Sequence, residues 1–145
     1  LTDPRLRVVW TMSNDQKSLL PRKVPPSFKI IGKLGQSTMR LLQREEVKVV
    51  VSHCGMGVAQ EALMFGKPLL CLPLFGDQID VAARILDHDI GRVLDKVRMT
   101  SSDVRRAILE IVHSYNSISK KAMRVGLTLK LQKKHLIPLL FSQLI

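Results

Sequence analysis

Short apolar runs rich in β-branched residues alternate with stretches of helical periodicity along this chain. The run Val47–Val51 suits a strand buried on both faces, and Leu69–Leu72 suits a second buried strand. Between them lies Val58–Phe65, an uninterrupted helix-forming run, and Gly66 and Pro68 follow it as residues that end a helix. This part of the chain is therefore predicted to form a strand, a turn, a helix and a second strand.

Similar patterns on both sides of this unit predict an α/β fold. Further strands are expected at residues 7–12, 28–31 and 90–94, and helices at 38–46, 79–87, from 100 and from about 117. Thr100 and Asp103 are spaced as in a capping box at the start of a helix. Residues 1–4 are expected to end a helix, and residues 13–27 and 32–37 to form loops. The residues expected on the inward helix faces are Ile79, Ala82, Ala83 and Leu86, then Val104, Ala107, Ile108, Ile111 and Val112, and finally Ile118, Ala122, Val125 and Leu129.

The length and composition are those of one domain with an aliphatic core. The chain has 145 residues, of which 46% are hydrophobic and only 4% aromatic. The two cysteines suggest either a reduced protein or simply the absence of a disulfide design, and Cys71 is expected to be a packing residue inside its strand. The sequence contains no recognisable signal peptide and no apolar run long enough to span a bilayer, and both a membrane-associated and a cytoplasmic location remain open. The first residue is not Met, which fits a fragment, although processing also removes an initiator Met.

A strong positive charge is the other unusual property. The formal net charge is +11, and residues 120–134 contribute six positive charges without an acidic residue among them: Lys120, Lys121, Arg124, Lys130, Lys133 and Lys134. Such a segment suits an anionic partner or membrane surface, a solvated helix face, or a face that meets an acidic surface elsewhere in a larger protein. Nucleic acid is not expected, because no binding motif and few aromatic residues are present. The apolar tail 135–145 is too short to span a membrane.

The turn between the first two core strands has the chemistry of an anion site. Backbone N–H groups at a helix start lack internal partners, and Gly55 and Gly57 leave them open to a phosphate. His53 adds a hydrogen-bond donor, Glu61 lies one turn into the helix, and Asp77–Gln78 follows the next strand with groups suited to sugar hydroxyls. Each feature alone has a simpler explanation, since the glycines can serve a tight turn and Asp77 can cap the following helix. Their joint spacing favours a ligand site.

These motifs resemble the donor-binding signature of the UDP-glycosyltransferases. The resemblance is carried by S-H-C-G-x-G-x-x-x-E-A-L-x-x-G-K-P-L-L-x-L-P-L-F-G-D-Q-x-D, is specific over residues 47–84 and continues more weakly through most of the chain. It implies the GT-B fold, in which two Rossmann-like halves enclose a nucleotide sugar. It also implies the following donor-binding residues: Gln36 for the nucleobase, His53, Cys54, Gly55 and Gly57 for the diphosphate, Glu61 for the ribose, and Asp77 and Gln78 for the sugar.

The chain departs from the family pattern at several of these positions. The usual His-Gly-Gly is His53-Cys54-Gly55, and the usual Asn-Ser or Asn-Gly pair is Gly57-Val58. Val81 replaces an Asn, and Lys33 stands in place of the Trp that precedes Gln36 in a Trp-x-Pro-Gln motif.

The resemblance predicts a Rossmann-like parallel sheet flanked by helices, the C-terminal half of a GT-B enzyme without its first strand and helix. Residues 1–145 are expected to form a single nucleotide-sugar-binding domain, with a core unit at about 28–95, C-terminal helices at about 100–134 and the tail 135–145. The expected activity is transfer of a sugar from UDP to an acceptor hydroxyl or amine. The acceptor site and the catalytic base would lie in the other half, so no catalytic residue is assigned here. Neither a metal nor a cofactor is expected, because the His and Cys residues lack metal-site spacing and the UDP-sugar is a co-substrate.

Two alternatives remain open. The chain could be the soluble subunit of a two-chain glycosyltransferase, active only with its partner. It could also be a degenerate, non-catalytic binding module that uses its basic helix for an anionic partner, as the departures at Cys54, Val58 and Lys33 allow. A Walker-type ATPase is excluded because no lysine follows the glycine turn.

Overall fold

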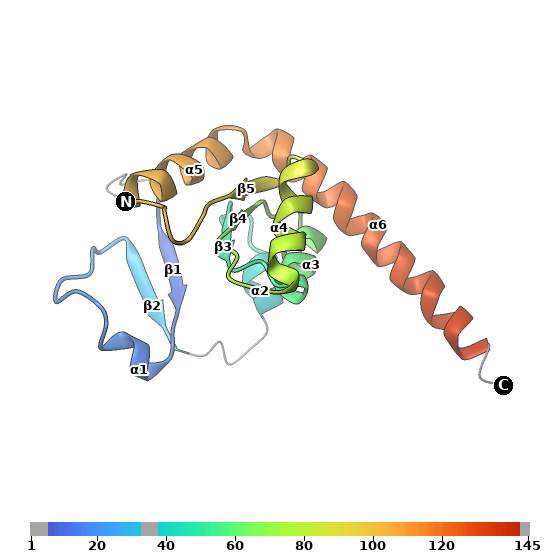
Figure 1. Cartoon of the computed structure of the whole chain (residues 1–145), viewed down its shortest axis with the longest axis horizontal. Helices are drawn as coiled ribbons and strands as arrows, with labels where there is room; N and C mark the ends of the chain where they lie inside the picture. The colour runs from blue at the N-terminus through green and yellow to red at the C-terminus, as the bar shows by residue number, and fades with distance from the viewer. Residues whose placement is uncertain (1–5, 33–37, 143–145) are drawn as a thin grey trace. The chain divides into compact units, whose positions relative to one another are not determined.

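We describe the chain from a computed structural model (Figure 1), which covers the backbone of residues 6–32 and 38–142 and the side chains of residues 6–32 and 38–132. Gln36 and the residues preceding Leu6 lie outside the described part. The chain forms two compact units, Leu1–Arg40 and Leu41–Ile145, which are treated separately below. Whether the chain functions as a single domain stays a prediction.

The first unit contains a parallel pair of strands. β1 (Val8–Thr11) pairs with β2 (Phe28–Ile31), so that Val8 lies opposite Phe28. Both strands occur where the sequence predicts them. The connection was expected to be a loop, but it includes the short helix α1 (Asn14–Lys17). Helix α2 (Thr38–Leu42), at the boundary of the two units, is shorter than the predicted 38–46 helix.

The second unit is built on a three-stranded parallel sheet with the order β3-β4-β5. These strands are β3 (Val50–Ser52), β4 (Leu69–Cys71) and β5 (Gly91–Val93). β4 is the central strand and is completely buried, as predicted. β3 lies at the edge of this sheet with Val51 47% exposed, so the prediction of a strand buried on both faces is wrong for β3.

Helices pack on both faces of this sheet because alternate residues of β4 point in opposite directions. Leu69 and Cys71 belong to one buried cluster, and Leu70 belongs to another. The first cluster includes residues of α3 (Met56–Met64), α4 (Asp77–Asp87) and the middle of α6 (Tyr115–Ser142). The second includes residues of α5 (Ser101–His113) and the first turns of α6. The predicted parallel sheet flanked by helices is therefore confirmed (Figure 1).

Helix α4 differs from its prediction in start and orientation. It begins at Asp77, two residues earlier than expected, and its buried residues are Gln78, Val81, Ala82 and Ile85. Ile79 is 57% exposed and Leu86 is 53% exposed, so of the predicted inward face only Ala82 is correct. Hydrogen bonds from a loop draw the polar Gln78 inward, and apolar periodicity alone does not predict this.

The last two helices follow their predicted patterns. In α5, the Thr100 side chain accepts a hydrogen bond from the Asp103 amide, and the Asp103 carboxylate accepts one from the Thr100 amide at 2.9 Å, which forms the predicted capping box. In α6, Ile118 and Ala122 are buried as predicted. Among the helices that the structure describes, none combines the length and apolarity needed to cross a membrane.

Candidate functional site

The glycine-rich turn joins the carboxyl end of β3 to the first turn of α3. Gly55, the N-cap residue, precedes the helix with extended backbone (φ −60°, ψ 151°) and has no side chain of its own to cap it. The first i to i−4 bond of the helix runs from the Ala59 amide to the Gly55 carbonyl. The amides of Gly57 and Val58 precede that bond and add to the partial positive charge of the helix N-terminus.

His53 lies against this turn from the β3 side. A Cβ atom added to Gly55 would come within 2.9 Å of His53 Nε2, so the imidazole occupies the space that a side chain at position 55 would need. His53 is exposed, whereas nothing lies within 4 Å of a Cβ at Gly57. The turn therefore combines an imidazole, two glycines and open space at a helix N-terminus.

Asp77 reaches this N-terminus from the first turn of α4. Its Oδ2 atom accepts a hydrogen bond from the Met56 amide at 3.2 Å, across 21 residues of sequence. Asp77 is itself the first residue of α4, and the residue before it, Gly76, is the N-cap. The carboxylate therefore caps α3 rather than the helix that follows it. An anionic group at this position is electrostatically favoured by the α3 dipole.

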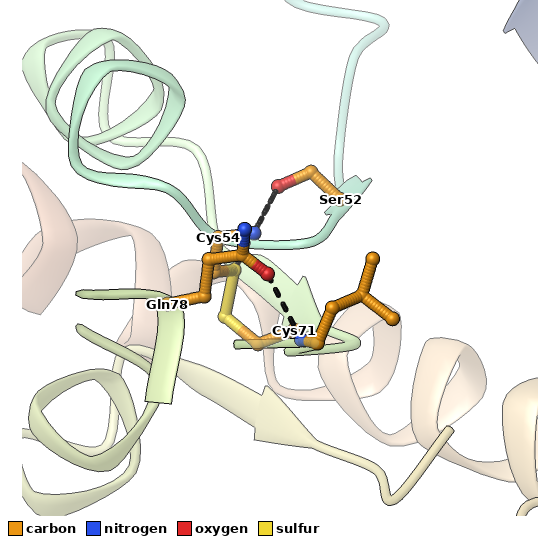
Figure 2. Close-up of a disulfide and its surroundings, with 5 residues drawn as sticks. Ser52, Cys54, Cys71 and Gln78 are labelled. Atoms are coloured by element: carbon orange, nitrogen blue, oxygen red, sulfur yellow. Dashed lines mark hydrogen bonds between the residues drawn. A yellow bond between two sulfur atoms is a disulfide. The ribbon is translucent and has the colours of Figure 1, made fainter. Parts of the chain in front are cut away.

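Gln78 is held in the protein interior. It is only 7% exposed, and its Oε1 atom accepts hydrogen bonds from the amides of Leu74 at 2.9 Å and Phe75 at 3.4 Å. The side chain thus fixes the loop between β4 and α4, and its oxygen is already used by the protein (Figure 2).

A disulfide joins the glycine turn to the end of β4. Cys54 and Cys71 are bonded, with their Cα atoms 5.3 Å apart, and both residues are fully buried (Figure 2). The expectation of unpaired cysteines is therefore wrong. Cys54 directs its side chain into the core, and its amide donates to Ser52 Oγ at 2.9 Å. Only the backbone of Cys54 can contribute to a ligand site at the surface.

Comparison with known proteins identifies the kind of protein to which this arrangement belongs. The profile of the UDP-glucuronosyl and UDP-glucosyl transferases matches residues 3–133. The chain belongs to this family. UDP-glucuronosyltransferase 3A1 of Xenopus laevis is 29% identical over 129 residues, which cover 79% of this chain and 24% of the relative. The human 2-hydroxyacylsphingosine 1-beta-galactosyltransferase is 26% identical over 121 residues, which cover 82% of this chain and 21% of the relative. The chain thus spans about a quarter of the length of these relatives.

Solved glycosyltransferase structures have the same fold as this UDP-glycosyltransferase-family chain. The spinosyn rhamnosyltransferase SpnG matches with a TM-score of 0.74 and 20% identity, over 86% of this chain and 32% of SpnG. A UDP-glucose:anthocyanidin 3-O-glucosyltransferase in complex with UDP matches with a TM-score of 0.72 and 22% identity, over 90% of this chain and 33% of that protein. These matches confirm the predicted GT-B fold class, and the chain spans about a third of the length of each of these structures.

The structure brings together some of the residues that the family signature singles out. His53, Gly55 and Asp77 meet at the start of α3, and Gly57 and Glu61 share one face of that helix because they are four residues apart. Glu61 is half-buried, and its carboxylate makes no hydrogen bond or ion pair with any residue that the structure describes. Gln36 lies outside the described residues. No group of three or more His, Cys, Asp or Glu side chains within 6–32 and 38–132 is placed to hold a metal ion.

Sequence reasoning missed three contributors to the site. The Ser52 hydroxyl accepts a hydrogen bond from the Cys54 amide, and the Met56 amide donates one to the Asp77 carboxylate. Cys71 holds Cys54 through the disulfide. A serine two residues before a turn residue is a recognised side-chain-to-backbone motif, so the sequence carried a weak signal for Ser52. The other two depend on how close the loops lie in space, which residue types do not reveal.

Proposed function

We propose that this chain is the donor-binding half of a glycosyltransferase that transfers a sugar from UDP to an acceptor hydroxyl or amine. The observation that carries the proposal is the N-terminus of α3, where His53 lies against Gly55 and the space beside Gly57 is open. Such a position suits the diphosphate of a nucleotide sugar. Family membership supplies the substrate class.

In the proposed reaction the acceptor oxygen or nitrogen forms a bond to the anomeric carbon as the bond from that carbon to the UDP oxygen breaks. Negative charge builds on the departing diphosphate, and the α3 amides and His53 stabilise it, which raises the rate of bond cleavage. The acceptor loses a proton to a base, and we assign that base to the rest of the enzyme rather than to this chain. We propose that no metal takes part in this stabilisation.

The remaining contacts with the donor follow from side-chain chemistry. Glu61 would accept hydrogen bonds from the ribose hydroxyls, and Asp77 would accept one from a sugar hydroxyl. Gln78 would act mainly by holding the loop before Asp77, because its oxygen binds two backbone amides. Cys54 would contribute its backbone, and we keep Gln36 as the proposed contact to the nucleobase.

Calorimetric titration with UDP, UDP-glucose, UDP-glucuronate and UDP-N-acetylglucosamine tests the proposal. We expect Glu61→Ala to weaken UDP binding about tenfold, since a hydrogen bond to a charged group contributes ~1.5 kcal/mol or more. Glu45→Ala is the matched control, because Glu45 is exposed and precedes β3, at the opposite end of the strand from the glycine turn. Failure of all four ligands to bind the unmodified chain, or equal losses in both variants, would refute the proposal.

We also propose that α6 contacts an anionic surface. Support comes from its exposed cations Lys120, Arg124 and Lys130 and from two exposed apolar residues beside them, Leu127 (52%) and Leu131 (57%). Co-sedimentation with vesicles tests this proposal. We expect the chain to bind anionic vesicles but not neutral ones. Binding should be lost in K120E/R124E/K130E and retained in the control variant K23E/K29E. Equal binding by both variants would contradict it.

A further inference from the structure

Cys54 has a backbone conformation that its side chain does not favour. Its φ is +61°, in the left-handed region, where an L-residue brings its Cβ close to the following carbonyl oxygen. Among the described residues other than glycine, Asp89 alone shares a positive φ, and aspartate tolerates that region better than most residues. Something in the structure must therefore hold Cys54 in place.

A disulfide and contacts with Ser52 hold it. The Cys54 sulfur is bonded to that of Cys71, the last residue of the central strand β4, and the Cys54 amide donates to Ser52 Oγ. The strand is completely buried and cannot shift easily, so the disulfide fixes the Cys54 side chain to a rigid support. The hydrogen bond to Ser52 restrains the backbone on the other side of the same residue.

The conformation of Cys54 determines how the neighbouring residues are presented. His53 precedes it, and Gly55, against which the His53 ring lies, follows it and leads into α3. If φ at residue 54 changed sign, the chain would leave β3 in a different direction, and the imidazole and the α3 amides would no longer meet. Cys71 ends β4, and the chain runs from there to Asp77, so the disulfide ties the glycine turn to the strand that precedes the Asp77 loop (Figure 2).

We propose that the Cys54–Cys71 disulfide is a positioning element of the donor site: it holds Cys54 in the left-handed conformation, and donor affinity falls when the bond is reduced. The proposal rests on the proposed function of this site as a UDP-sugar site. The side chains of Cys54 and Cys71 are buried, touch no substrate and act through His53 and the start of α3. The affinity of the site for UDP thereby depends on the redox state of the chain.

The test compares the full chain in its oxidised and reduced forms by calorimetric titration with UDP. Dithiothreitol breaks the sulfur–sulfur bond, giving two cysteine thiols while its own two thiols become a cyclic disulfide. Because both sulfurs are buried, alkylation and mass spectrometry confirm that reduction is complete. We expect UDP binding to weaken roughly five- to tenfold on reduction, because Cys54 is then no longer constrained to the left-handed conformation.

Two variants separate positioning from general stabilisation. Cys71→Ala leaves a cysteine at a position with positive φ, and it should lower both the melting temperature and UDP affinity. C54G/C71A also lacks the crosslink, so its melting temperature should fall similarly, but glycine adopts positive φ without penalty and should restore UDP affinity. Dithiothreitol should not affect UDP binding by the double variant.

Several results would overturn the proposal. Unchanged UDP affinity in the reduced chain and in Cys71→Ala would do so, as would equal losses of affinity in Cys71→Ala and C54G/C71A. If oxidised wild type does not bind UDP, the proposed function fails instead. In that case, scalar couplings measured by NMR still test whether the disulfide holds Cys54 in the left-handed conformation. A positive φ at residue 54 in Cys71→Ala would show that it does not.

Discussion

At the residue scale, Asp77 is a member of the proposed donor site with a defined partner in the protein. Its carboxylate accepts from the Met56 amide, and in the proposed function it also binds a sugar hydroxyl. Asp77→Asn keeps an acceptor oxygen but removes the charge. We expect UDP affinity to change less than about threefold and UDP-sugar affinity to fall about tenfold, because a hydrogen bond to a charged acceptor is the stronger one. Calorimetric titration of wild type and the variant with UDP and with the UDP-sugar measures both changes in affinity.

Asp77→Ala provides the comparison for that prediction. It removes the acceptor from the α3 N-terminus as well, so it should lower the free energy of unfolding by about 1 kcal/mol, the usual value of a helix cap. Asp80→Ala, in the same first turn of α4, is the control. An equal loss of UDP and UDP-sugar affinity in Asp77→Asn would argue against a sugar contact.

A second residue, Asp89, makes stability depend on pH. Hydrogen bonds from Lys121 at 2.6 Å and Arg92 at 3.1 Å hold the pKa of the Asp89 carboxyl below its usual range. A lowered pKa in the folded state means that this stabilisation is complete above the pKa of the unfolded chain and is lost as pH falls through the folded value. Because the pair is solvent-exposed, it contributes only ~0.5 kcal/mol.

Asp89→Asn isolates this contribution, since asparagine also tolerates the positive φ of 49° at this position. We expect wild type to be the more stable protein at pH 7, and the difference to shrink as pH falls below about 4 and to vanish once the pH is below the lowered pKa of folded Asp89. Urea unfolding across this range measures the difference. A gap that is independent of pH would mean that the charge of Asp89 is not responsible.

At the scale of elements, the contact between α3 and α6 depends on a glycine. A Cβ atom on Gly126 would lie 2.1 Å from the carbonyl oxygen of Leu63, so the backbones of the two helices approach as closely as glycine permits. Gly126→Ala should therefore lower the free energy of unfolding by about 2 kcal/mol, despite the better helix propensity of alanine. Chemical denaturation measures this loss.

Gly57→Ala is the matched control for stability. Gly57 also lies in a helix, but nothing is found within 4 Å of an added Cβ atom. Its replacement should leave stability unchanged or raise it by up to ~1 kcal/mol. If the two substitutions had the same effect, close approach of α3 and α6 would not explain the requirement for Gly126.

The elements also show how far sequence reasoning reached. Strand β2 and the start of α5 were predicted to the residue because alternation, length and capping chemistry are local properties. The inward face of α4 was not predicted correctly, because the amides of Leu74 and Phe75 in the preceding loop hydrogen-bond Gln78 and draw it inward. The same distinction between local properties and contacts of distant residues applies to the site. The glycine turn was evident from residue types, whereas the disulfide depends on a left-handed turn that brings Cys54 within 5.3 Å (Cα–Cα) of Cys71.

At the scale of the whole molecule, the buried core is concentrated in the unit Leu41–Ile145. Both clusters of buried apolar residues lie entirely within it, and so does the disulfide. In the unit Leu1–Arg40, the described part contributes one buried hydrophobic residue, Met12, and a two-stranded sheet, which is marginal by itself. We therefore expect a fragment of residues 41–145 to fold alone, with a cooperative thermal transition by circular dichroism, and a fragment of residues 1–40 to remain unfolded.

The same fragment tests how the donor site is divided along the chain. Residues 41–145 keep the proposed diphosphate and ribose contacts at His53, Gly57 and Glu61 but lack Gln36, the proposed nucleobase contact. The fragment should bind UDP and GDP within about threefold of each other, whereas the full chain should prefer UDP by tenfold or more, since a buried base left without its hydrogen-bond partner costs ~1–3 kcal/mol. Full selectivity in the fragment would place nucleobase recognition within residues 41–145, and a non-cooperative transition would show that the first unit is needed for folding.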